Sequence, residues 1–460
     1  MNEWNFLNWD DALLQLQKAI ATQATKLLKI CEHEPLVILR DWQGKITLCM
    51  PCSRDALSQS ELSGWVTSLG VSLGLLASAP DITYCKDEFF DPDDIWMSPN
   101  LVALTPNGDL RFSLLDRQDK ENDWLRKSSD DFAGKGTPRA IFFGVKGGVG
   151  RSSALTSLAL RLAESGKKVL IIDADFESPG VSSIMLDREV RPDYGLIDWF
   201  TAHALGADPL LLNELISKKI VETSPLSQKT NGLIKVAPSH GTLTQAYVSK
   251  LGRIYRPTMD GQTFAQRLSL LIAGMEKEHD IDVTLIDSRA GIDDTGAATI
   301  TQLHARAVFL FAMDTSQTWD AYTLLFKHLT KHPSLSFVQE QRPDQDFRRA
   351  LRIVSAMTPE EVGSTVGYLE NFKNAAYDTC VAIYDKIEYA PIDEDDDSPE
   401  DPLLFAPAFV DEDAPHDPML IMWDEVLRGF DPVRQPGQLA PTVIAKAFGD
   451  FLGKATKLLE

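Results

Sequence analysis

Residues 141–153 read Ile-Phe-Phe-Gly-Val-Lys-Gly-Gly-Val-Gly-Arg-Ser-Ser. The stretch places a glycine-rich loop directly after an apolar strand and directly before a segment of helical character. Gly147, Gly148 and Gly150 allow positive φ values and close approach of the backbone. The N–H groups of residues 147–151 and the start of the following helix can therefore converge on an anion. This pattern predicts a phosphate-binding loop.

The loop carries two cations and two hydroxyl groups. Lys146 stands at its front, and Arg151 takes the position before the hydroxyl residue where such loops usually have lysine. Arginine keeps the positive charge and can hold phosphate in a planar fork, but it is bulkier than lysine. Ser152 is placed to offer its hydroxyl to Mg²⁺. Val149 and Ser153 complete the stretch of 146–153 that we expect to bind a nucleotide.

Carboxylates follow two further apolar runs. Lys168–Asp173 ends in a carboxylate and continues into Asp175, and Val283–Asp287 ends in a third carboxylate. In open α/β sheets, ligands bind at the C-terminal ends of parallel strands. We expect Asp287 to hold Mg²⁺ through water, Asp175 to orient an attacking water, and Asp173 to shape the site from behind. The alternative for each aspartate is a helix N-cap after a strand.

These motifs resemble the ParA/MinD-like (SIMIBI class) P-loop ATPases, whose deviant loop has the form Lys-Gly-Gly-x-Gly-Lys-[Thr/Ser]. The match here is Lys146-Gly-Gly-Val-Gly-Arg151-Ser152, a KGGVGR variant of that Walker A loop. It continues through Asp173-Ala-Asp175 as the switch I segment and Leu285-Ile-Asp287 as the Walker B strand. The resemblance covers residues 139–390 and extends to the C-terminal helix.

The resemblance implies Mg²⁺ and ATP as cofactors and an ATP-dependent homodimer. In the family the early lysine reaches the partner's nucleotide, which gives Lys146 a catalytic role beside Asp175. The strand from Leu351 to Thr358 carries Ser355 where relatives often place an asparagine for adenine. The choice between adenine and guanine therefore stays open. The departure at Arg151 leaves the rate of hydrolysis open.

The composition restricts the partners. The chain has 460 residues and a formal net charge of −22, which repels nucleic-acid phosphates, so we do not expect a nucleic-acid partner. Its five cysteines are irregularly spaced, as in reduced cytoplasmic proteins. Cys49 and Cys52 form a single C-x-x-C that could hold zinc with Cys31 and Cys85; we favour the alternative that Cys49 lies on an apolar strand. No apolar run reaches membrane-spanning length.

The sequence predicts two domains. Residues 1–135 form a small α+β domain, with a helix over 9–31, hairpins at 36–49 and 102–114, and a capping box at Ser58 and Glu61 that opens a helix to 78. Residues 117–137 are expected to be a linker. Residues 136–460 alternate strands and helices, which predicts a doubly wound, mostly parallel α/β sheet. Its expected strands are 139–143, 168–172, 233–237, 283–287, 306–312 and 351–356, and its expected helices include 151–165, 198–205, 263–278 and 318–331.

Three segments lie outside this alternation. Residues 181–232 form a long excursion that is either a packing insertion or a partner surface. Residues 393–401 carry seven carboxylates and continue into an acidic stretch at 411–417; we expect a solvated, disordered loop over 393–417, and the alternative is a docking strip for a basic partner. Residues 441–460 predict an amphipathic helix with Ile444, Phe448, Phe451, Ala455 and Leu458 on one face. We expect it to pack on the ATPase domain; the alternative is peripheral membrane binding, as in MinD relatives.

Two functions fit these features. The first is a cytoplasmic, dimeric ATPase switch that controls a partner protein through the N-terminal domain or residues 181–232. The second is a catalytically weak nucleotide-binding scaffold of a multi-protein system, such as a defence system, which the Arg151 substitution motivates. An electron-transfer ATPase is excluded, because no cysteine lies between Cys85 and Cys380 to hold a cluster.

Overall fold

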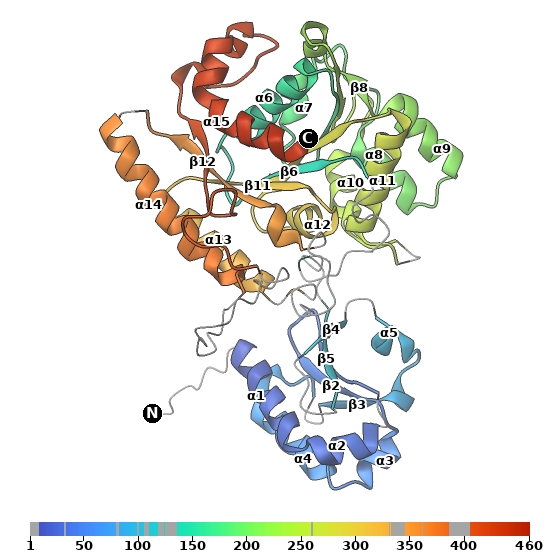
Figure 1. The fold of residues 1–460 in the computed structure, drawn as a ribbon. Coiled ribbons are helices and arrows are strands. Elements are labelled where there is room, and N and C mark those ends of the chain that lie inside the picture. Colours follow the sequence, from blue (N-terminus) through green and yellow to red (C-terminus); the bar gives the residue numbers. More distant parts are fainter. Residues whose placement is uncertain are drawn as a thin grey trace, which may run out of the picture. The chain divides into compact units, whose positions relative to one another are not determined.

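The computed structural model divides the chain into two compact units, Met1–Asn122 and Asp123–Glu460 (Figure 1). Each unit is described by itself. The structure describes residues 9–31, 34–79, 82–98, 101–104, 110–117, 124, 136–258, 261–330, 332, 346–360, 362–385 and 405–460. The division falls earlier than the expected boundary after residue 135, since Trp124 is buried in the core of the second unit and contacts Phe143 edge-on.

The first unit has an α+β fold in which helices pack on a single sheet. The sheet has the order β3-β2-β1-β5-β4, with antiparallel pairs β1–β2 and β4–β5 and parallel pairs β1–β5 and β2–β3. Apolar residues of the helices and of one sheet face form its main core. The strands and helices are β1 (Leu36–Arg40), β2 (Ile46–Met50), β3 (Thr83–Cys85), β4 (Leu101–Ala103), β5 (Phe112–Asp116), α1 (Trp9–Thr22), α2 (Ala24–Cys31), α3 (Arg54–Ser58), α4 (Ser63–Leu73) and α5 (Asp93–Trp96).

Both predicted hairpins are present, and helices lie where two were expected, as α1 and α2 over 9–31 and as α4 after the predicted capping box, but two details differ. The expected helix over 9–31 is interrupted between α1 and α2. The capping box at Ser58 and Glu61 does not form: Ser58 ends α3 and its hydroxyl donates to the Arg54 carbonyl, while Glu61 pairs with Lys26. Both side chains therefore bond to groups other than those the capping box would use, as often happens with short polar motifs.

The second unit is built on a sheet of the order β13-β12-β11-β6-β10-β7-β9-β8, in which only the pair β8–β9 is antiparallel among the described strands. Its interior strands are nearly continuous apolar runs, which is the pattern of parallel strands covered on both faces. All six predicted strands are present. The strands are β6 (Arg139–Gly144), β7 (Lys168–Asp173), β8 (Glu222–Thr223), β9 (Leu233–Ala237), β10 (Val283–Ala290), β11 (Ala307–Ala312), β12 (Leu351–Thr358) and β13 (Met419–Met422).

Helices cover both faces of this sheet (Figure 1). One face carries α6, α7 and α15, and the other carries α8 and α11 to α14. The doubly wound α/β class predicted from the sequence is confirmed. The helices are α6 (Arg151–Glu164), α7 (Val181–Met185), α8 (Leu196–Ala204), α9 (Pro209–Glu214), α10 (Tyr247–Ile254), α11 (Phe264–Glu278), α12 (Asp294–Gln302), α13 (Ser316–Leu329), α14 (Val362–Cys380) and α15 (Pro441–Leu459).

The helix α15 packs on the sheet through its apolar face. Phe451 is fully buried and meets the rings of Phe142 and Phe309 edge-on. Ile444 and Leu458, which the sequence placed on the same face, are only half-buried at its margin. Among the described residues, no helix is long and apolar enough to cross a lipid bilayer.

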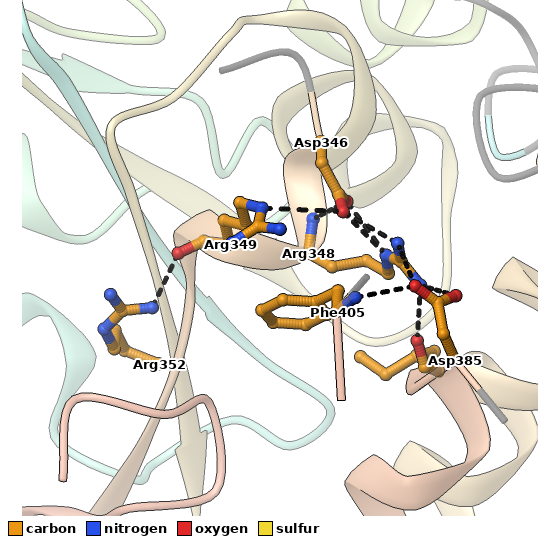
Figure 2. Close-up of polar contacts among 7 residues, drawn as sticks. Asp346, Arg348, Arg349, Arg352, Asp385 and Phe405 are labelled. Atoms are coloured by element: carbon orange, nitrogen blue, oxygen red, sulfur yellow. Dashed lines mark hydrogen bonds and ion pairs between the residues drawn. The ribbon is translucent and has the colours of Figure 1, made fainter. Parts of the chain in front are cut away.

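A buried charge network joins segments that are distant in sequence. Arg348 pairs with Asp346 and Asp385 at 2.8 Å each and stacks over the Phe405 ring (Figure 2). The Phe405 N–H donates to Asp385, whose own N–H donates to the Phe405 carbonyl. The network therefore brings together the two residues that bracket 386–404. The acidic stretch 393–401 itself lies outside the described residues.

The acidic stretch 411–417 differs from the expected solvated loop. His416 is fully buried, where its ring bonds to Tyr384 and packs on Tyr377. Asp417 pairs with Lys373 and Lys454 at 3.4 and 3.3 Å. These ion pairs hold the stretch against α14 and α15, so its charges are partly compensated.

Candidate nucleotide site

The phosphate loop lies at the C-terminal edge of the parallel sheet, between β6 and α6. Gly148 and Gly150 have φ values of 76° and 82°, a region that side chains with a Cβ rarely adopt. Gly150 is also the N-cap of α6. The glycines thus bend the chain so that the loop ends on the positive pole of a helix, as the sequence predicts.

Ser152 and Asp287 meet at this edge. The Ser152 hydroxyl donates to Asp287 Oδ2 at 2.8 Å, although the two residues come from α6 and β10. Asp287 is fully buried, and its other oxygen, Oδ1, has no hydrogen-bond partner in the described part of the chain. Burial raises the pKa of Asp287, while Arg151 and the Ser152 hydroxyl oppose the rise. A buried hydroxyl–carboxylate pair with a spare oxygen fits Mg²⁺, which prefers oxygen ligands and keeps waters.

Arg151 lies among the carboxylates. One guanidinium nitrogen, Nη2, donates to Asp175 at 3.2 Å, and Nε lies 3.7 Å from Asp287. The side chain is about nine-tenths buried, and its remaining nitrogen, Nη1, has no partner among the described residues. A buried cation with an unsatisfied donor, beside the glycine nest, is suited to an oxygen-rich anion such as phosphate.

Asp173 and Asp175 complete the carboxylate group. Asp173 sits beside Asp287 in the register of β7 and β10. It is fully buried and accepts the Ser182 N–H at 3.1 Å, and burial, together with the nearby Asp287, raises its pKa to about 7. Burial also raises the pKa of Asp175 to about 6, although Arg151 opposes the rise. Negative charge is therefore costly here unless a cation accompanies it.

Lys146 differs from Arg151. Its side chain is half-buried at the front of the loop, and it forms no ion pair within the described ranges. Arg151 thus contacts carboxylates of its own chain, whereas Lys146 is available to a ligand or to another molecule.

A second polar group that the sequence analysis missed links the two loops after β7 and β10. Arg289 pairs with Glu177 at 3.1 Å and with Asp293 at 3.2 Å, and Tyr255, the C-cap of α10, donates to Glu177 at 2.8 Å. The signal in the sequence was the run of polar residues after each strand, but their pairing depends on α10, whose position no local pattern gives.

Ser355, which was expected near the base, has a hydroxyl that is already paired within β12. Ser355 is fully buried, and its hydroxyl bonds to Thr358 at 2.9 Å. Of the residues singled out from the sequence, the loop 146–153, Asp173, Asp175 and Asp287 gather at one edge of the sheet. Ser355 lies at the same carboxyl end, opposite Ala312 at the end of β11 and two strands away from β6.

Comparison with known proteins agrees with this geometry. Residues 140–289 match the family described as "AAA domain". The antiactivator FleN of Pseudomonas aeruginosa is 27% identical over 185 residues, which are 40% of this chain and 53% of FleN. Residues 140–289 are thus similar to this family, and the motifs of the same stretch resemble those of ParA/MinD-like P-loop ATPases.

Two further proteins resemble part of this chain. A putative arsenical pump-driving ATPase 2 from Aquifex aeolicus is 29% identical over 147 residues, 31% of this chain and 43% of that protein. The crystal structure of a ParA family ATPase from Chlorobium tepidum TLS is matched with 15% identity and a TM-score of 0.38, over 69% of this chain and 98% of that one. The chain thus spans about half the length, or less, of the two curated relatives.

Proposed function

We propose that this protein binds and hydrolyses Mg²⁺-ATP and uses the nucleotide to switch between states that a partner protein recognises. The observation that carries the proposal is the cluster of three unsatisfied or partly satisfied groups at one sheet edge: Asp287 Oδ1, Arg151 Nη1 and the glycine nest. Native proteins leave few buried polar atoms without partners, and such atoms often mark a ligand site. The sequence similarity to ATPases supports ATP as that ligand.

The residues have distinct proposed roles. Ser152 and Asp287 hold Mg²⁺, the latter through water, and Mg²⁺ neutralises phosphate charge when it is bound. The loop N–H groups, Lys146 and Arg151 contact phosphate. Asp175 orients the attacking water, and Asp173 keeps the carboxylates in place. Arg151 can contact phosphate through its unpartnered Nη1 while Nη2 stays with Asp175.

The dimeric state and the site of partner binding extend this proposal. Lys146 forms no ion pair among the described residues, so it can act in a second molecule's site, as the resemblance implies. We place partner binding on the N-terminal unit or on residues 181–232. The composition of the chain favours a protein partner in the cytoplasm over nucleic acid.

The proposal is tested by isothermal titration of Mg²⁺-ATP into the parent and the Gly150→Val variant. Valine is strained at φ 82° and its side chain narrows the nest, so binding should be lost. Gly252→Val, at a helix position where a Cβ meets nothing, is the control that should bind normally. Equal affinity of Gly150→Val and the parent would refute the site.

The second candidate function, a nucleotide-binding scaffold, is favoured by one observation: Arg151 is engaged by two carboxylates of its own chain. Phosphate release by the pure protein with Mg²⁺-ATP separates the two. Binding without turnover would favour the scaffold.

A further inference from the structure

A cavity of about 500 Å³ lies on the α6 face of the second unit, away from the phosphate loop. It opens between α6, α15 and the turn at residues 225–230. Its apolar walls are Leu160, Leu226, Leu439, Ile444 and Leu452. All of these lie in segments that the structure describes without a break. The volume is in the range of small-molecule pockets, about 300–1,000 Å³.

Two glycines of α15 form part of the lining. Gly449 and Gly453 are one helical turn apart, and a Cβ built on either would meet no atom within 4 Å. Glycine inside a helix costs about 0.5–1 kcal/mol relative to alanine. Packing within the chain does not require glycine at these positions, since alanine would fit. The glycines instead leave a channel in which a thin apolar group can lie against the helix backbone.

The charged residues of the lining indicate which polar group a ligand of this cavity would carry. Arg161 and Lys229 line the same cavity, and neither forms an ion pair within the described ranges. Glu164 is the one acidic residue of the lining, so the cavity carries two positive charges and one negative, a net +1. The chain as a whole carries −22. A cationic pocket on so acidic a protein selects anions locally.

We propose that this cavity binds a single acyl chain with an anionic head, such as a free fatty acid. The chain would lie along Gly449 and Gly453 between the leucine walls, and the carboxylate would face Arg161 and Lys229. No covalent step is involved. The site does not depend on the nucleotide function, because none of its residues belongs to the phosphate loop or the carboxylate group.

The test is calorimetric titration of the full-length protein with decanoate, kept below its micelle concentration. The parent should bind it, and Gly453→Leu should bind at least tenfold more weakly, because leucine fills the channel. Gly453→Leu should fold, since its Cβ meets nothing and leucine favours helix. Gly252→Leu makes the same change in open space on α10 and should bind like the parent.

Two further measurements test whether the ligand's anionic head group faces Arg161 and Lys229. Arg161→Gln with Lys229→Gln should weaken decanoate binding by about two- to tenfold, as expected for exposed ion pairs. Decyltrimethylammonium, with the same chain and opposite charge, should bind more weakly than decanoate. Failure of the parent to bind decanoate, equal binding by Gly453→Leu, or binding only to phosphatidylglycerol vesicles in a flotation assay would each overturn the proposal.

Discussion

At the scale of single residues, Arg151 decides how the loop works. Arg151→Ala should weaken ATP binding by one to two orders of magnitude, because a charge-assisted contact to phosphate contributes about 1.5–3 kcal/mol. Arg151→Lys should keep binding and raise turnover, since lysine's smaller head leaves Asp175 less engaged. Titration calorimetry and phosphate release measure both. If Arg151→Ala binds ATP as well as the parent, the guanidinium serves only the carboxylates Asp175 and Asp287.

Asp173 provides a prediction about pH. Its pKa is raised from 3.8 to about 7 in the folded protein, so the folded state binds a proton more tightly than the unfolded chain does. Stability should therefore fall as pH rises from about 4 to 7. Asp173→Asn removes this loss and should be more stable than the parent at pH 8 by on the order of 2–4 kcal/mol. The difference in melting temperature should shrink toward pH 4; a difference that stays constant with pH would contradict the assignment.

At the scale of elements, α15 closes one face of the sheet. Phe451 is completely buried between the rings of Phe142, Phe309 and Phe311. Phe451→Ala should destabilise the second unit by about 3–5 kcal/mol through lost burial and a cavity. Chemical denaturation followed by circular dichroism measures this. Val443→Ala, on a half-buried position of the same helix, is the control and should cost far less.

The elements also show how far sequence reasoning extends. Strands such as β7 and β10 were predictable, because buried parallel strands are apolar runs ended by polar residues. The loop 146–153 was predictable because its glycines and hydroxyls act locally. The edge strands β8 and β13 were missed, since they are short and pair only through tertiary contacts. The contact of Arg151 with Asp175 and Asp287 was also missed, because it depends on where β10 and the loop after β7 meet α6.

At the scale of the whole molecule, Lys146 is the residue through which we expect two chains to meet. ATP should shift the protein to dimer mass in light scattering, and Lys146→Ala should abolish that shift. Lys167→Ala is the matched control: it also removes one half-buried cation, but at the N-terminal end of β7, the edge opposite to the phosphate loop. A mass that does not respond to nucleotide in the parent would exclude the dimeric switch.

The hydrogen bonds between Asp385 and Phe405, beside Arg348, have a practical consequence for protein engineering. Because Asp385 and Phe405 bond to each other, the two residues that bracket 386–404 are held together. The entropy of closing such a loop changes by only about 0.6 kcal/mol for each doubling of its length. A fluorescent protein or an epitope inserted between residues 393 and 401 should therefore leave the melting temperature nearly unchanged. This position offers a reporter site for following the protein in cells.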